Sequence, residues 1–123
     1  MTMPIKHFFP ALAWLVFITV LSTMPGVQLP RFSLIGTDKL GHAFVYGVLV
    51  WLVLRGVARA GAARSAWIGF AAFAFSAGYG AFMEWVQGTF FPGRFFEWDD
   101  MIANTFGAAV GWLVAHLTIS VKD

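Results

Sequence analysis

The sequence predicts an all-α integral membrane protein, a bundle of four helices that cross the bilayer. Its 123 residues are 59% hydrophobic and only 11% charged, and the mean hydropathy is +0.76. Soluble domains carry roughly 25% charged residues, so this chain cannot cover its surface with polar side chains, and its expected solvent is the lipid bilayer. The apolar runs are long and do not alternate, which argues against the strands of a membrane β-barrel.

The predicted membrane helices are four apolar segments, at residues 6–24, 38–57, 65–88 and 99–121. The first follows Lys6 and His7, as a cleaved signal peptide would, but a retained helix is favoured because no small-x-small cleavage site follows it. The third segment is rich in Ala and Gly, and the fourth carries a G-x-x-x-G pair, Gly107 and Gly111. Small side chains at such spacing let membrane helices approach closely. We expect the segments to form one domain, residues 1–123.

Composition also excludes several classes of protein and site. Cys is absent, which rules out disulfides, thiolate metal ligands and cysteine nucleophiles. The net charge of +2 is too small and too dispersed to indicate a nucleic-acid partner. The sequence implies no cofactor, and it does not fix an oligomeric state.

The basic residues favour an orientation with both termini in the cytoplasm, in a multi-pass protein of the inner (cytoplasmic) membrane. The positive-inside rule supports this orientation because three arginines fall in the short connection between the second and third segments. The basic residues then expected inside are Lys6, Arg55, Arg59, Arg64 and Lys122, and those expected outside are Arg31, Lys39 and Arg94. Most of the acidic and amide side chains consequently gather at the outer membrane face.

The start of the second segment carries three polar side chains at four-residue spacing: Asp38, His42 and Tyr46. Residues four apart share a helix face, so these side chains can meet one ligand. There are structural alternatives. Asp38 complements the positive end of the helix dipole, and a lone His can simply hydrogen-bond within the bundle.

Glu84 is the ionisable residue that is hardest to explain by structure alone. It lies near the end of the third segment, where the helix dipole disfavours a carboxylate, and an ionisable group among apolar neighbours in a membrane helix is a functional hypothesis by default. The alternative is a carboxyl group that is kept neutral or paired for structural reasons. Ser76 and Gly80 precede Glu84 at four-residue spacing, so Glu84 is expected to face the inside of the bundle, and Gln87 lies close to the same stripe of the helix.

The start of the fourth segment and the loop before it supply the remaining candidates. Asp99 or Asp100 can cap the helix, which is a structural role, and Asn104 shares a face with Asp100. Arg94 follows a Pro-Gly turn pair and is either a solvated loop residue or a bidentate clamp for a phosphate or carboxylate.

These motifs, taken in order, resemble the VanZ-like family. They are Asp38-Lys39-x-x-His42-x-x-x-Tyr46, Glu84-x-x-Gln87, Pro92-Gly93-Arg94 and Asp100-x-x-x-Asn104-x-x-Gly107-x-x-x-Gly111. The resemblance implies a small polytopic membrane protein. The family takes its name from an accessory protein that lowers susceptibility to the glycopeptide teicoplanin, so a link to glycopeptide resistance is an association that the resemblance implies.

Two hypotheses about function remain open beside a purely structural role. In the first, a cell-envelope protein without catalytic activity binds a lipid-linked or amphiphilic ligand in a pocket at the outer face, built by Asp38, Lys39, His42, Tyr46, Glu84, Gln87, Arg94, Asp100 and Asn104. In the second, a membrane-embedded hydrolase or transferase acts on a lipid-linked substrate, with His42 as general base, Asp38 or Asp100 orienting it, and Glu84 as acid. A metal version of that enzyme would use His42, Glu84 and an Asp as ligands, although the chain has no H-E-x-x-H motif.

Overall fold

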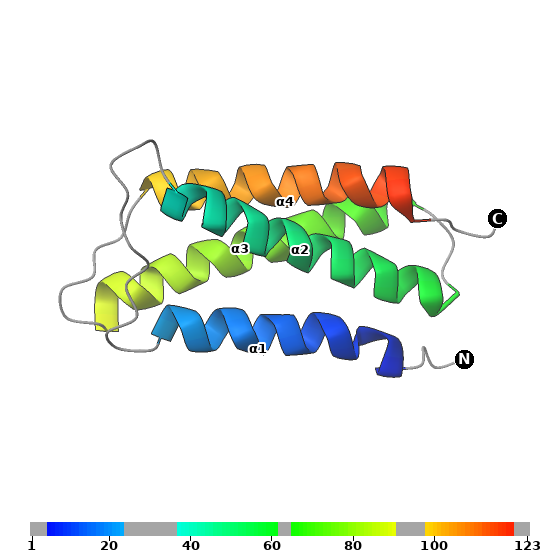
Figure 1. Cartoon of the computed structure of the whole chain (residues 1–123), viewed down its shortest axis with the longest axis horizontal. Helices are drawn as coiled ribbons and strands as arrows, with labels where there is room; N and C mark the ends of the chain where they lie inside the picture. Colours follow the sequence, from blue (N-terminus) through cyan, green and yellow to red (C-terminus); the bar gives the residue numbers. More distant parts are fainter. Residues whose placement is uncertain (1–4, 24–36, 62–64, 91–97, 120–123) are drawn as a thin grey trace.

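The computed structural model contains four long helices that lie lengthwise beside one another (Figure 1). It describes residues 5–23, 37–61, 65–90 and 98–119, with the backbone alone for Thr37, Asp38, Lys39 and Asp99. A short 3-10 helix, η1, precedes the first α-helix. The elements are η1 (Ile5–Phe8), α1 (Phe9–Thr23), α2 (Thr37–Arg59), α3 (Ala66–Phe90) and α4 (Trp98–Thr118). These described residues form no strand, and the predicted all-α four-helix class is confirmed.

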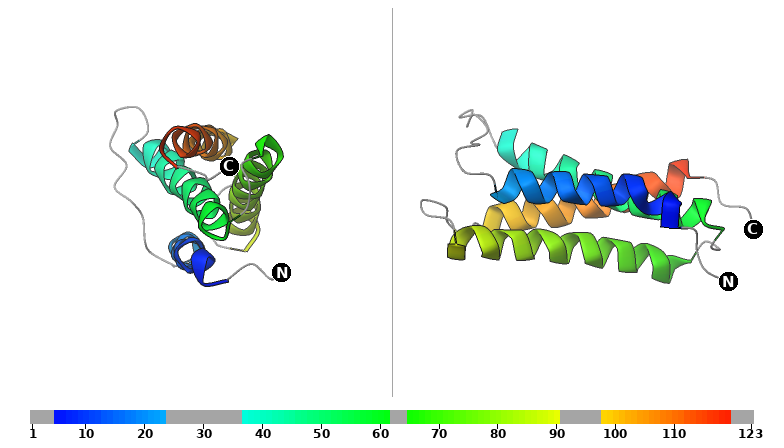
Figure 2. Two further views of the ribbon diagram at one scale, coloured as in Figure 1. Left: turned by 90° about the vertical axis from the view of Figure 1, so that its right-hand side faces the viewer. Right: turned by 90° about the horizontal axis from the view of Figure 1, so that it is seen from below.

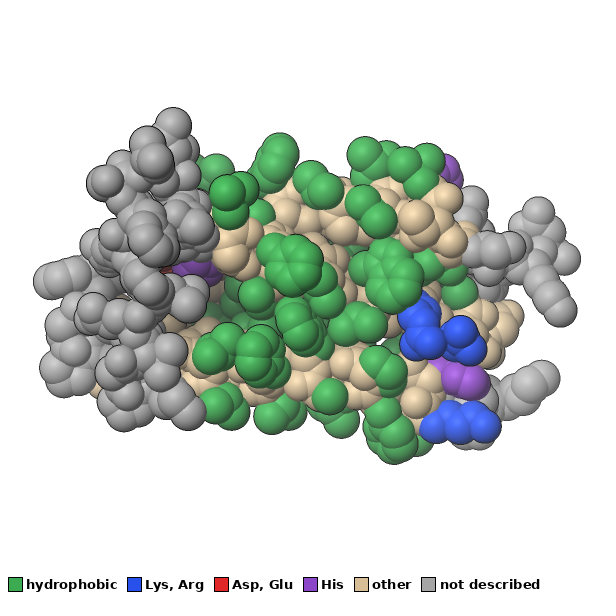
Figure 3. All heavy atoms as spheres, viewed as in Figure 1, with side chains coloured by type: hydrophobic (Ala, Val, Ile, Leu, Met, Phe, Trp, Pro, Cys, Tyr) green, Lys and Arg blue, Asp and Glu red, His purple; other side chains and the backbone are tan. Residues whose placement is uncertain are grey.

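Each of the four helical stretches is long and apolar enough to cross a membrane. Their mean hydropathies lie between 1.3 and 1.6, and only 11% to 28% of each apolar window is buried inside the bundle. The apolar side chains therefore face outward, as Figure 3 shows for one side of the molecule. Trp67 and Leu117, for example, are 73% and 72% exposed. Such a surface is stable only against hydrocarbon, so the chain is a multi-pass membrane protein.

The two ends of the bundle differ in character. The start of η1 and the end of α4 lie at the same end of the bundle (Figures 1 and 2), as an even number of crossings requires. The Lys and Arg side chains in the described part of the surface seen in Figure 3 gather at this same end. These basic side chains include Lys6, Arg55 and Arg59, and all three were predicted to lie on the cytoplasmic side. The orientation of the bundle in a membrane stays a prediction.

The helices differ from the predicted segments mainly at their ends. The second segment was expected to stop at residue 57, but α2 continues to Arg59, and Ala60 still donates its amide to the Gly56 carbonyl at 2.9 Å. The chain leaves the helix at Gly61, whose φ of 89° is a left-handed conformation that glycine adopts without strain. The predicted segment stopped where the polar residues begin, whereas α2 runs on through them to Arg59, shortly before Gly61.

The α2 and α4 helices form the most extensive interface of the bundle, and glycines let their backbones touch. A Cβ added at Gly107 would lie 2.0 Å from the Ala43 carbonyl oxygen, and one added at Gly111 would lie 2.2 Å from the Gly47 carbonyl oxygen. Gly47 is itself covered by the Gly107 carbonyl oxygen, 2.8 Å from an added Cβ. The G-x-x-x-G pair thus lies at a helix contact so close that no larger residue fits without a backbone shift.

Apolar packing and one buried hydroxyl complete the interior. Val50, Ala72 and Ala108 form a buried cluster where α2, α3 and α4 meet. One turn after Ala72 on α3, the fully buried Ser76 donates its hydroxyl to the Tyr46 carbonyl at 3.1 Å. This contact joins α3 to α2 without a long side chain, which is typical of membrane helix interfaces.

The α1 helix is attached to the bundle less extensively than the other three, through the packing of Ile18 against Tyr46 and Leu49 and through polar contacts. The Trp14 indole donates to the Val45 carbonyl on α2 at 2.8 Å. On the α3 side, the Thr19 and Tyr79 hydroxyls form a hydrogen bond. The only buried α1 residues are Ala11 and Ile18. The core of the fold is therefore the α2–α3–α4 unit, with α1 bound against one side of it (Figure 2).

Substitution of Gly107 tests the importance of the α2–α4 contact. Gly107→Ala places a methyl group against the Ala43 backbone, and overpacking of this kind costs about 1–3 kcal/mol or more. Gly78→Ala on α3 is the matched control, because nothing lies within 4 Å of the added Cβ. Thermal unfolding of the purified chain in one detergent should show a lower midpoint for Gly107→Ala and no loss for Gly78→Ala. Equal midpoints would contradict the proposed tight contact.

Candidate functional site

Three ionisable side chains from three different helices come together at the end of the bundle opposite η1 and the last turn of α4. They are His42 of α2, Glu84 of α3 and Asp100 of α4, and their potential ligand atoms all lie within 4.8 Å of one another. Asn104, one turn after Asp100, completes this group, which we call the polar cluster (His42, Glu84, Asp100 and Asn104). The cluster therefore contains the three residues predicted as candidates for catalysis. It also contains Asn104, one of the two amide side chains predicted in the pocket.

The polar cluster lies a short way inside the helix ends. By helical rise, His42 is about 7 Å from the first residue of α2, Asp100 about 3 Å from that of α4, and Glu84 about 9 Å from the last residue of α3. The starts of α2 and α4 both carry the positive ends of their helix dipoles, which stabilise nearby carboxylates. The site is thus shallow in the bundle yet lies inside the helical, apolar part of the chain.

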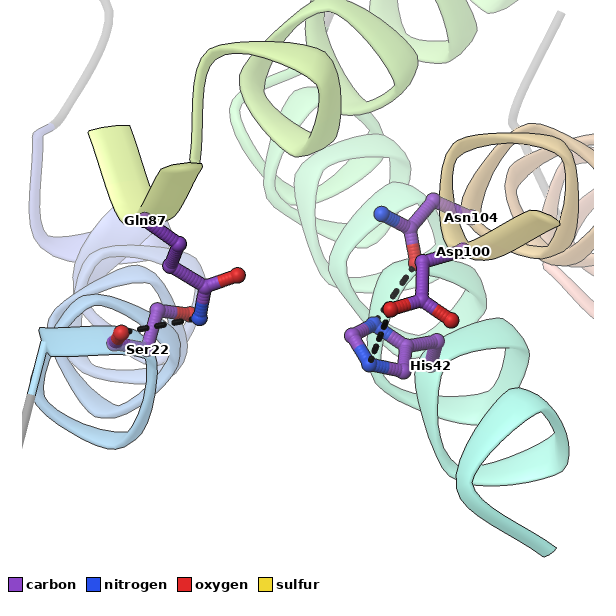
Figure 4. A network of polar contacts seen from close by, with 5 residues as sticks. All are labelled: Ser22, His42, Gln87, Asp100 and Asn104. Atoms are coloured by element: carbon purple, nitrogen blue, oxygen red, sulfur yellow. Dashed lines mark hydrogen bonds and ion pairs between the residues drawn. The ribbon is translucent and has the colours of Figure 1, made fainter. Parts of the chain in front are cut away.

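The close contact of α2 and α4 brings two members of the cluster together. Ala43 follows His42 directly, and Gly107 lies three residues after Asn104. Because Ala43 and Gly107 touch through their backbones, the preceding side chains on the two helices face each other across the same interface. The His42 Nδ1 atom is 3.1 Å from the Asn104 Oδ1 atom (Figure 4).

This hydrogen bond selects one form of the imidazole ring. An amide oxygen only accepts, so His42 Nδ1 carries the proton and donates it to Asn104. The other ring nitrogen, Nε2, faces the Asp100 carboxylate, with 3.7 Å between Nε2 and Oδ2 (Figure 4). That distance is longer than a hydrogen bond, so the ring nitrogen and the carboxylate oxygen face each other across a short gap without bonding directly.

Most of the polar cluster is shielded from solvent. Glu84 is 2% exposed and Asn104 1%, whereas the His42 side chain keeps 29% of its surface accessible. Gly80 makes room for the amide, since a Cβ at this position would lie 2.8 Å from Asn104 Nδ2. The histidine is therefore the member of the cluster through which a small molecule gains contact.

The remaining predicted site residues are placed differently. Gln87 was expected in the pocket with Glu84, but its amide donates to the Ser22 carbonyl at 2.8 Å and so joins α3 to α1, away from His42 (Figure 4). Tyr46 is 3% exposed and packs with Ile18 and Leu49 one turn deeper than His42. Asp38 and Lys39 lie in the first turn of α2, where only the backbone is described, and Arg94 lies outside the described residues.

Sequence reasoning gave Gly80 no role of its own. The residue belongs to the Ser76–Gly80–Glu84 stripe that marks the inner face of α3, where all three are buried. Four-residue spacing of small and polar residues in an apolar helix was the available signal. This spacing identifies which face of α3 points inward. It does not identify which side chain of another helix fills the space above Gly80.

The arrangement supports two kinds of chemistry. The imidazole and the two carboxylates are groups that transfer protons, and they are close enough to act on one bound molecule. The same three groups also form a set of nitrogen and oxygen ligands that could hold a divalent cation. Among the described residues, His42, Glu84 and Asp100 are the one set of three His or acidic side chains that lie close enough together to hold a metal ion.

The orientation of the His42 ring is directly measurable. In protein labelled with ¹⁵N-histidine, we expect the nitrogen shifts of His42 to show a protonated Nδ1, and Asn104→Ala to abolish this preference because the acceptor is gone. The variant should also lose about 1–3 kcal/mol of stability through the unsatisfied donor. Gly80→Ala should have the same spectroscopic effect by displacing the amide, while Gly78→Ala should have none. A wild-type His42 protonated on Nε2 alone would contradict this hydrogen bond.

Comparison with known proteins identifies the family. A family model described as VanZ/LLP1 matches residues 5–119, a range that includes all four helices and the whole polar cluster. Comparisons with curated proteins and with solved structures gave no match. The resemblance inferred from the ordered motifs is confirmed, and the chain belongs to the VanZ/LLP1 family.

Proposed function

We propose that this chain is an inner-membrane protein that binds the polar head of a lipid-linked or other amphiphilic molecule at the outer end of its bundle. The observation that carries the proposal is the polar cluster itself. Burying ionisable groups among apolar helices is costly, and such groups in membrane proteins usually mark a substrate or ion site. Here three of them, from three helices, converge within 4.8 Å.

The position of the cluster suits an amphiphile. It lies about 3–9 Å from the ends of its helices, which is the depth at which a lipid head group meets the acyl region. The described outer surface of the helices is apolar and contacts lipid chains directly. A molecule that already lies in the bilayer can therefore place its head in the cluster and leave its chain in the membrane.

Two basic residues that lie near the cluster in the sequence indicate what kind of head group it would bind. Lys39 and Arg94 belong to the segments that flank the cluster in the sequence, and in the proposal they attract an anionic group at its rim. Arg94 would bind a phosphate or carboxylate in a bidentate manner. His42 and Asn104 would then contact the neighbouring polar atoms. The proposed ligand is an anionic amphiphile with additional hydroxyl or amide groups.

A second candidate function is hydrolysis or group transfer on a lipid-linked substrate. The 3.7 Å approach of His42 Nε2 to Asp100 Oδ2, with Glu84 beside them, favours it. His42, held in place by Asn104, would act as general base and take a proton from the attacking water or hydroxyl group, and the buried Glu84 would supply a proton to the leaving group. Conversion of the lipid probe used below, detected by mass spectrometry, would separate this function from binding alone.

Substitution of Glu84 distinguishes function from structure. Glu84→Gln preserves the shape and much of the hydrogen bonding but cannot ionise, so we expect normal membrane abundance and thermal stability together with loss of ligand binding. Binding is measured by crosslinking to a photoactivatable phosphatidylglycerol in nanodiscs. The control is His116→Gln, at the exposed far end of α4. If Glu84→Gln crosslinks as well as wild type, the site is wrong at its central residue.

A cellular test addresses the association with glycopeptide resistance. Expression of the wild-type chain in a teicoplanin-susceptible host should lower susceptibility, and Glu84→Gln, expressed at the same membrane abundance, should not. Arg94→Lys should behave like Glu84→Gln, because Lys keeps the charge but loses the bidentate geometry. Unchanged susceptibility with the wild-type chain would remove resistance from the proposal without affecting lipid binding.

The proposed orientation is testable in a background that is already free of Cys. Ser65→Cys and Thr89→Cys place single thiols at exposed positions near opposite ends of α3. In intact spheroplasts, a membrane-impermeant maleimide should label the cysteine at 89 but should reach the one at 65 only after lysis. The reverse pattern would move the polar cluster to the cytoplasmic face.

A further inference from the structure

We infer that the polar cluster is a binding site for one divalent cation, held by His42 Nε2 and by carboxylate oxygens of Glu84 and Asp100. A cation at this place deepens the proposed function, because it would bind the anionic head group of the ligand. This role of the cation rests on the proposed function. Binding of the cation itself does not rest on that function, and it is measured without any lipid ligand.

The first argument is the spacing of the three groups. A zinc ion about 2.1 Å from both His42 Nε2 and Asp100 Oδ2 would subtend a ligand–metal–ligand angle of roughly 120° at their present separation of 3.7 Å. The widest spacing in the group is 4.8 Å, against roughly 3.4 Å between the ligands of a four-coordinate zinc. Binding of a four-coordinate zinc would therefore bring the most distant ligand atoms about 1.4 Å closer together.

The second argument is the hydrogen bond on the far side of the histidine. A histidine that binds a metal through one nitrogen normally donates the proton of the other nitrogen to a neighbouring oxygen. His42 does so toward Asn104, at 3.1 Å, and this bond leaves Nε2 facing the Asp100 carboxylate, 3.7 Å away. The ring is thus held in the tautomer and direction that a cation in the cluster requires.

The third argument is the way that the site is built. The three ligands come from α2, α3 and α4, the helices of the tightly packed unit, so their backbones are fixed relative to one another. Gly80 and the 1% exposed Asn104 support the ring without contacting the cation. Two carboxylates and one dication also balance in charge, which lowers the cost of placing all three in a medium of low dielectric constant.

The ligand set indicates which cations fit and what they would do. One imidazole with two carboxylates suits zinc, manganese or ferrous iron better than calcium or magnesium, which prefer oxygen ligands alone. Three protein ligands leave at least one coordination position open. Because the His42 side chain is 29% accessible, that position can receive an oxygen of an anionic head group, such as a phosphate.

The test is metal binding by the full chain purified in detergent and stripped with a chelator. Titration with Zn²⁺ and, separately, with Mn²⁺ should show about one tightly bound equivalent of at least one of these ions. His42→Gln and Asp100→Asn should each abolish that equivalent. Asn104→Ala, which removes no ligand, should weaken binding roughly 10–100-fold. His116→Gln is the matched control, because it removes an exposed histidine at the far end of the bundle and should change nothing.

Thermal unfolding of every variant is measured without metal, and each titration is carried out below the temperature at which that variant begins to unfold, so that only folded protein is compared. Absence of a bound equivalent in the wild type would overturn the inference. So would a His42→Gln variant that binds metal normally. Failure of lipid crosslinking with intact metal binding would reject the proposed amphiphile alone, whereas crosslinking by the metal-free wild type would reject only the role of the cation in holding the head group.

Discussion

Backbone contact between α2 and α4 is the constraint on which the rest of the structure depends. Gly107 and Gly111 have no side chain to separate them from Ala43 and Gly47, so the two helices cross with their carbonyl groups against each other's Cα atoms. In lipid, where apolar side chains gain nothing by leaving the solvent, such close packing supplies much of the association energy. The register that it fixes also decides which polar side chains meet further along the same interface, and His42 and Asn104 are the pair that results.

Lipid also explains why the polar groups are so few and so concentrated. A polar side chain inside a membrane bundle must find its partner within the protein, because water is not available to it. The described interior meets this requirement with short contacts, such as the Ser76 hydroxyl on the Tyr46 carbonyl and the Trp14 indole on the Val45 carbonyl. Three ionisable side chains in one place exceed what helix association needs, and this excess sets the polar cluster apart from the structural contacts.

The sequence was sufficient for the class of fold and for the choice of unusual residues, because both depend on local composition. Apolar run length located the helices, and the isolated charges of Glu84 and His42 were visible against their neighbours. Contacts between helices depend on rotation and register, which a single sequence does not specify. Gln87 illustrates this limit: it lies one turn beyond Glu84 but is rotated enough to reach Ser22 on α1 instead of the cluster. Similarly, no pattern indicated that Gly80 makes room for Asn104.

The order of the helices along the chain has a consequence for biogenesis. Ribosomal synthesis delivers α1 and α2 to the membrane first, but the tightest interface of the fold, between α2 and α4, can form only after the last helix has been inserted. Until then, His42 is in the membrane without Asn104 and Asp100, both of which are made more than fifty residues later. The partly inserted chain must therefore shelter a polar side chain at the translocon or near the lipid head groups. Completion of the site and completion of the fold then occur in the same final step.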